Sequence, residues 1–179
     1  LALQLQTRGV NVTTLHVARV MRTEERIQQF LDVTDRVDLI VLAFPLYVDS
    51  LPYLVTAALE RWADHRQAQI QLQPGSLLAI ANCGVPEAHH NRTALAICRQ
   101  FVDTVGLEWA GGLALGAGGA IHGQPLSETG GMVRHIVQAL DMTAEALAVG
   151  KPAPVEAAEL MARPMMPSRL YTFMGDTGW

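Results

Sequence analysis

The sequence of 179 residues has little of what several specialised classes of protein need. Its two cysteines, Cys83 and Cys98, are too few for a disulfide framework, and their spacing matches no zinc motif. Its net charge of -4 provides no excess of basic residues to attract nucleic acid. No apolar run approaches the ~20 residues that span a bilayer. We therefore expect a cytoplasmic protein that binds neither nucleic acid nor membrane.

Apolar residues are what the chain has in quantity. Half of the residues are hydrophobic and only 17% are charged, which argues against disorder over most of the length. A chain of this size forms one domain with a sizeable core. Residues 150–154 have the composition of a linker. We therefore divide the chain into a domain at 1–150 and a C-terminal tail at 151–179.

Strand and helix patterns alternate along the chain. Apolar, branched runs predict four strands, at 10–17, 37–44, 76–81 and 109–115. Amphipathic patterns predict helices between them, at 1–8, 24–33, 51–66, 89–105 and 127–149. This alternation is typical of an α/β doubly wound parallel sheet. The run at 37–44 is continuously apolar, so we expect it to be the central strand, buried on both faces.

The loop after this run changes character abruptly. Two prolines, Pro45 and Pro52, bracket a tyrosine, an aspartate and a serine, and a helical pattern follows directly. In a doubly wound sheet, ligands bind outside the carboxyl ends of the strands. The loop therefore predicts a ligand site with a flat aromatic wall at Tyr47. The alternatives are that Tyr47 only covers the sheet edge and that Asp49 caps the following helix.

Several segments resemble one known family. Residues 44–52 (FPLYVDSLP) resemble the flavin-facing loop of the flavodoxin-like NAD(P)H-dependent FMN reductases. Residues 82–88 (NCGVPEA), followed by Asn91, resemble the next cofactor loop of that family, and residues 101–112 are similar to its last strand. Met166–Pro167 and Gly178–Trp179 resemble its C-terminal tail. The likeness is strongest between residues 10 and 119.

The resemblance implies a flavodoxin-like sheet and a flavin-dependent oxidoreductase. FMN would mediate the reduction of a small acceptor by NAD(P)H, in a homo-oligomer. The family's first strand and its phosphate loop have no counterpart here, so we expect this chain by itself to bind FMN poorly. No catalytic side chain and no metal ligand are assigned, because the cofactor carries the hydride chemistry. The residues implied to bind the flavin are Pro45, Leu46, Tyr47, Val48, Asp49, Ser50, Asn82, Cys83, Gly84, Gly118 and Gly119.

The chemistry of a flavin fits these residue types. Its ring needs a flat wall, which Tyr47 can supply, and donors near N5 and O4, which the amides at 48–50 can supply. The pyrimidine edge can be met by Asn82 and by the amides of Cys83 and Gly84. The alternative function is a flavodoxin-like electron-transfer or non-catalytic module that no longer binds flavin. The small acidic excess favours the enzyme.

Other motifs have structural interpretations that we prefer. Cys83 has no adjacent cation in the sequence, so an inert thiol is favoured over a redox thiol. The His89–His90 pair suits a solvated helix start better than a shared metal ion. The glycine-rich stretch 116–123 lacks the lysine of a phosphate-binding P-loop, so we expect it to turn beneath the flavin or the substrate. His122, in this stretch, is a weaker candidate for a substrate contact.

Overall fold

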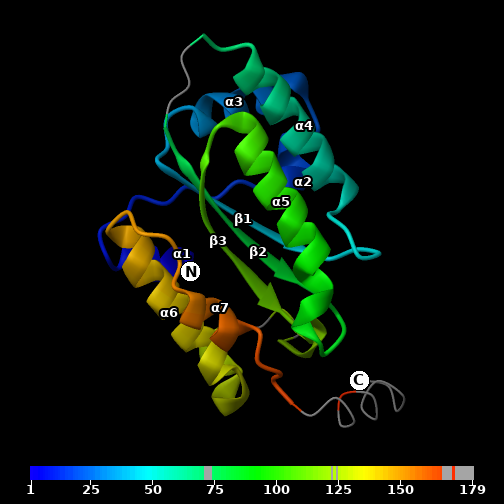
Figure 1. Ribbon diagram of the computed structural model, residues 1–179, viewed down its shortest axis with the longest axis vertical. Coiled ribbons are helices and arrows are strands. Elements are labelled where there is room, and N and C mark those ends of the chain that lie inside the picture. The colour runs from blue at the N-terminus through cyan, green and yellow to red at the C-terminus, as the bar shows by residue number, and fades with distance from the viewer. Residues whose placement is uncertain (71–73, 122, 124, 167–170, 172–179) are drawn as a thin grey trace.

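A three-stranded parallel sheet lies between two groups of helices (Figure 1). The strands are β1 (Leu39–Pro45), β2 (Ser76–Asn82) and β3 (Glu108–Leu115), in the order β1-β2-β3. This computed structural model describes residues 1–70, 74–121, 123, 125–166 and 171. β2 is the most buried strand, because Leu77, Leu78, Ala79 and Ala81 are all enclosed by the two helical layers.

One helical layer consists of α2 (Val17–Val20), α3 (Glu24–Thr34), α4 (Tyr53–Gln67) and α5 (Arg92–Val105). The layer packs around Trp62, whose ring lies 6.1 Å from that of Phe30 and 5.2 Å from that of Phe101. The start of α3 follows from its sequence, because the Thr23 side chain accepts a hydrogen bond from the Arg26 amide at 3.4 Å. These contacts fix α3, α4 and α5 against one face of the sheet.

The other layer consists of α1 (Ala2–Gln6), α6 (Arg134–Ala148) and α7 (Val155–Met161). Its core joins Leu78 and Leu113 of the sheet to Ile136 of α6 and Met161 of α7. The helix α7 lies within the range expected to be a tail, yet it packs on α6 and β3 with Met161 1% exposed. Four short 3-10 turns complete the described elements: η1 (Ala88–Asn91), η2 (Gly118–Ile121), η3 (Leu126–Glu128) and η4 (Gly130–Val133).

The predicted strand at 10–17 is wrong. Residues 10–16 have no regular structure, and Val17 begins the short helix α2. Val10 and Val12 pack against the core that the sheet shares with α1, α6 and α7, so these apolar side chains are partly buried without pairing in a sheet. A strand depends on a hydrogen-bonding partner as well as on its own residues. The other three predicted strands are confirmed, and they pair in parallel.

Two further expectations are corrected. β1 is an edge of the described sheet and not its centre, and most of its residues are only half buried. The long helix expected from Ser127 begins at Arg134, after η3 and η4. Gly130 has a φ of +75°, a left-handed conformation that an α-helix cannot continue through. No helix among the described residues is both long and apolar enough to cross a membrane.

Candidate ligand site at the carboxyl edge of the sheet

The loops that follow the three strands are tied together at one edge of the sheet. The Leu46 amide, just after β1, donates to the Asn82 carbonyl at the end of β2, at 2.7 Å. Beyond β3, the Gly118 amide donates to the Cys83 carbonyl at 2.9 Å, and the Ala117 amide donates to the Val85 carbonyl at 2.7 Å. The residues predicted to bind flavin all lie on these loops or at the strand ends that lead into them.

The first loop contains a strained two-residue turn. Tyr47 and Ser50 exchange two backbone hydrogen bonds, each 3.1 Å long, around Val48 and Asp49. Both central residues have positive φ, +49° and +58°, as in a type I′ turn, which normally takes asparagine and glycine. A left-handed conformation is unusual for a β-branched residue and costs about 1–2 kcal/mol. The fold therefore holds Val48 in a conformation that its side chain disfavours.

This turn exposes both an aromatic ring and backbone donors. Tyr47 is 62% exposed and Val48 is 99% exposed. Among the backbone hydrogen bonds of the described residues, neither the Val48 nor the Asp49 amide is a donor. A flat ring beside two open amides can bind a planar ligand that carries hydrogen-bond acceptors.

The loops after β2 and β3 approach one another so closely that only glycine fits between them. A Cβ atom at residue 118 would lie 2.6 Å from Asn82 Oδ1, and one at residue 116 would lie 2.1 Å from the Pro86 carbonyl oxygen. The structure therefore places Asn82 and Gly118, two of the residues implied to bind the flavin, next to each other. Ala117, between the two glycines, also has a positive φ, +54°.

The buried Asn91 connects the loop after β2 to the end of β3. Its side chain is fully buried, and Nδ2 donates to the carbonyls of Ala88 at 3.1 Å and of Leu115 at 3.0 Å. The same nitrogen lies 3.4 Å from Cys83 Sγ. Sequence reasoning noted Asn91 only within a resemblance and assigned it no part in the site. Its contacts span 24 residues to Leu115, so no local pattern reveals them.

Cys83 is a buried thiol. Burial raises its pKa, an effect that outweighs the opposing hydrogen bonds from Asn91 and the nearby backbone. The neutral thiol is a poor nucleophile, so its environment agrees with the interpretation of Cys83 as inert. Cys98, on the core face of α5, is fully buried and its pKa is raised to about 12. It therefore contributes packing.

Tyr171 reaches the same edge from the end of the chain. Its hydroxyl donates to the Gly84 carbonyl and lies 3.6 Å from the position of a Cβ atom on Gly119. Burial, together with the nearby Cys83, raises the pKa of the phenol. Sequence reasoning gave Tyr171 no role, and the 87 residues that separate it from Gly84 explain why. The Tyr171 hydroxyl therefore lies close to both Gly84 and Gly119, two of the residues implied to bind the cofactor.

The two adjacent histidines lie in the turn η1, which precedes α5. The rings of His89 and His90 stack 4.5 Å apart and are exposed before α5. The described residues contain no cluster of three or more potential metal ligands. His122 lies outside the described residues.

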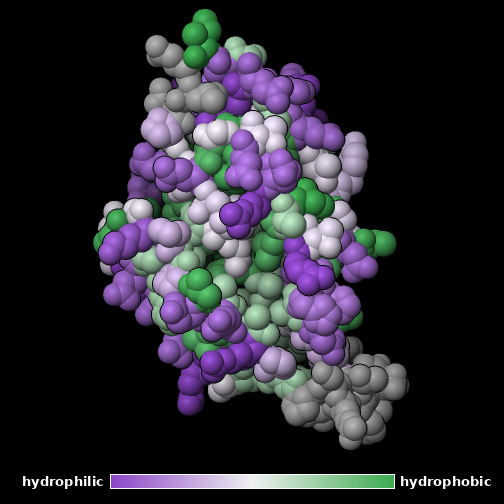
Figure 2. All heavy atoms as spheres, in the orientation of Figure 1, coloured by the Kyte–Doolittle hydropathy of each residue, from purple (hydrophilic) through white to green (hydrophobic). Residues whose placement is uncertain are grey.

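A shallow groove of about 500 Å³ opens beside the candidate site. Figure 2 shows a pale and green strip of small and apolar residues running between α5 and the α6–α7 pair, over β3. The groove is lined by apolar residues (Leu95, Ala114, Ala162 and Pro164) and by polar ones (Glu87, His89 and Arg92). Ala88 also lines it, so the loop after β2 borders both the groove and the site.

The residues at this edge fit the ring of a flavin better than its phosphate. Tyr47, the open amides and the glycine loops offer a wall and hydrogen-bonding groups for a planar heterocycle. In contrast, residues 46–52, 83–91 and 116–121 contain no lysine or arginine to pair with a phosphate dianion.

Comparisons with known proteins bear on the fold. No family model matches this chain, and no curated protein matches its sequence. Among solved structures, it is similar to the rubredoxin oxygen:oxidoreductase of Desulfovibrio gigas, with a TM-score of 0.56 and 10% sequence identity. The match covers 83% of this chain and 30% of that chain, so our chain spans less than a third of its length. The α/β fold is flavodoxin-like.

Proposed function

We propose that the protein is a flavin-dependent oxidoreductase in which FMN carries electrons from NAD(P)H to a small acceptor. The observation that supports this most directly is the convergence of three loops at the carboxyl edge, with an exposed aromatic ring and open amides. Ligands of doubly wound sheets bind at this edge. The similar solved structure is itself named an oxidoreductase, which agrees with the proposal.

In this proposal, the chain binds and orients the flavin, and the flavin supplies the hydride chemistry when it is bound. Tyr47 packs against one face of the ring by offset stacking. The amides of Val48 and Asp49 donate to the edge of the ring where negative charge develops on reduction. Asn82 and Gly84 face the pyrimidine end. The groove beside the loop 86–88 receives NAD(P)H or the acceptor. The cytoplasmic location and the homo-oligomer belong to the same proposal.

The test compares two tyrosines that lie in the same part of the sequence. Tyr47→Ala removes the proposed wall, whereas Tyr53→Ala removes an 81% exposed ring at the start of α4. We expect Tyr47→Ala to weaken flavin binding by about 1 kcal/mol, a roughly fivefold rise in Kd, and Tyr53→Ala to leave it unchanged. Quenching of flavin fluorescence measures both. Equal Kd values for the two variants would place the ring elsewhere.

FMN and lumiflavin, the same ring without ribityl phosphate, should be titrated in parallel. Because the three loops present no lysine or arginine, we expect the two ligands to bind with similar affinity. A large preference for FMN would show that a phosphate site outside these loops contributes.

A second candidate function is a flavodoxin-like module that does not bind flavin. The hydrogen bond from Tyr171 to Gly84 favours it, because the chain's own side chain already occupies an acceptor of the site. Oxidation of NAD(P)H in the presence of FMN and an artificial acceptor separates the two candidates. The enzyme requires turnover that falls in Tyr47→Ala, whereas the module shows none.

A further inference from the structure

The phenol of Tyr171 occupies a defined place between two loops. Its hydroxyl donates to the Gly84 carbonyl, and among the described residues it is the only group within 4 Å of a Cβ position on Gly119. A Cβ atom on Gly84 would meet nothing within 4 Å among the described residues, so the space beside this glycine is open. An aromatic group with one donor thus fits beside an open glycine face.

The same description applies to one end of a flavin. The pyrimidine end of the isoalloxazine ring is flat and carries a single imide N–H donor. A backbone carbonyl of a glycine is a suitable acceptor for such a donor, since the glycine has no side chain of its own to block the approach. The Tyr171 hydroxyl and the imide N–H can therefore bond to the same acceptor, the Gly84 carbonyl. The two rings cannot occupy the same space beside it, so they compete.

We propose that the Gly84 carbonyl and Gly119 form a subsite for flat rings that carry one donor, which Tyr171 fills in the free protein and which a flavin's imide end takes over. This inference rests on the proposed function and adds a residue that controls affinity. Tyr171 competes with the ligand, so the measured affinity is lower than the subsite itself would give.

If Tyr171 competes with the ligand, removing its hydroxyl should strengthen ligand binding. Tyr171→Phe keeps the ring but removes the hydroxyl that bonds to Gly84. Loss of one competing hydrogen bond should lower the Kd for lumiflavin by roughly two- to tenfold. Tyr171→Ala, which also removes the ring, should lower it at least as much. Tyr53→Phe is the matched control, because it deletes a hydroxyl from an exposed tyrosine outside the site, and it should leave the Kd unchanged.

A second readout follows Tyr171 directly. Protein labelled with fluorotyrosine gives a fluorine resonance for Tyr171, assigned by its loss in Tyr171→Phe. Burial and Cys83 raise the pKa of this phenol in the free protein. Saturating lumiflavin should shift the resonance and return the pKa toward its ordinary value, because the displaced phenol leaves both influences.

The outcomes separate this inference from the proposed function. If lumiflavin binds more tightly to Tyr171→Phe while FMN binds to no form of the protein, the subsite stands and the FMN function fails. An unchanged or raised Kd for lumiflavin in Tyr171→Phe overturns the inference, as does a Tyr171 resonance that saturating lumiflavin does not move. If neither flavin binds wild type or any Tyr171 variant, both the inference and the function are overturned.

Discussion

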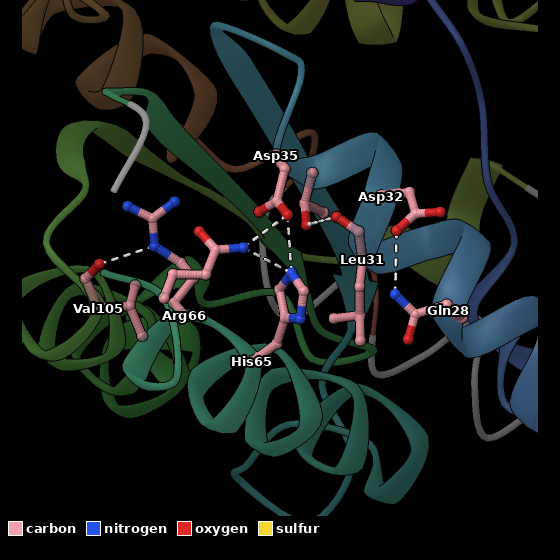
Figure 3. A network of polar contacts seen from close by, with 9 residues as sticks. Gln28, Leu31, Asp32, Asp35, His65, Arg66 and Val105 are labelled. Atoms are coloured by element: carbon pink, nitrogen blue, oxygen red, sulfur yellow. Dashed lines mark hydrogen bonds and ion pairs between the residues drawn. The ribbon is translucent and has the colours of Figure 1, made fainter. Parts of the chain in front are cut away.

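At the amino edge of the sheet, polar side chains bond to one another, whereas at the carboxyl edge the backbone is strained and the amides of Val48 and Asp49 are open. Figure 3 shows Asp35 and His65 pointing toward each other at the amino edge, with Asp35 Oδ2 lying 2.7 Å from His65 Nε2. The side-chain nitrogen of Gln69, Nε2, donates to the same oxygen at 2.7 Å. At the other edge, Val48 and Asp49 adopt left-handed conformations with open amides.

The amino edge also contains a buried cation with a clear structural role. Arg66 is 2% exposed, and its Nε donates to the Val105 carbonyl at 2.8 Å (Figure 3). Burial lowers the pKa of the guanidinium, and the nearby Asp35 carboxylate opposes this shift. These contacts connect α3, α4 and the entry to β3. This edge contributes stability, whereas the strained edge is the one to which our proposal assigns the ligand, in keeping with the frequent occurrence of strained backbone at functional sites.

The largest expected effect is on the glycine packing of the carboxyl edge. Gly116→Ala would place a Cβ atom 2.1 Å from the Pro86 carbonyl oxygen, so the two loops must separate. We expect a loss of roughly 3 kcal/mol in the free energy of unfolding, measured by urea denaturation. Gly84→Ala is the control, because its Cβ meets nothing within 4 Å among the described residues. Equal losses in both variants would contradict the close approach.

The next effect tests the amino edge. Arg66→Met removes the donor to Val105 and the positive charge near Asp35, so we expect a loss of about 2 kcal/mol in stability. Arg61→Met removes an exposed arginine that pairs with Glu24 at the surface, and it should cost at most ~0.5 kcal/mol. Thermal and urea unfolding measure both. Lumiflavin should bind folded Arg66→Met as it binds wild type; weaker binding would contradict the separation of the two edges.

The smallest effect concerns strain in the turn. Val48→Gly allows the positive φ without a Cβ penalty, so we expect stability to rise by about 0.5–1 kcal/mol even after glycine's greater entropy in the unfolded chain is counted. A parallel Val85→Gly change, at an exposed valine without positive φ, should not stabilise. If Val48→Gly is destabilising, the turn is not strained in solution.

Local signals in the sequence were sufficient for much of the fold. The apolar runs located β1, β2 and β3, and the amphipathic pattern at 24–33 located α3. The segment 10–17 failed because Val10 and Val12 pack against a core cluster without a strand partner. The position of β1 at an edge could not be read either, since strand order depends on pairing across the whole sheet.

The candidate site also contains residues that the sequence pointed to and residues that it did not. The loop at 45–50 was proposed as a ligand site because it directly follows a predicted strand, and the residues at 82–84 and 118–119 were implied by the family resemblance. The contributions of Asn91 and Tyr171 were not predicted, because each bonds to a carbonyl far away in the chain. The strain at Val48 was also hidden, since valine is a residue that sequence patterns rarely place in a left-handed turn.

Hydrogen–deuterium exchange with and without saturating lumiflavin tests most directly the claim that the carboxyl edge binds the ring. Amides at 46–50, where two donors are open, should gain the most protection, and those at 82–88 should gain protection as the loop orders around the ligand. Amides around Asp35 and at 65–69 should exchange at unchanged rates. Protection that appears at this amino edge, or nowhere in the two loops, would contradict the account.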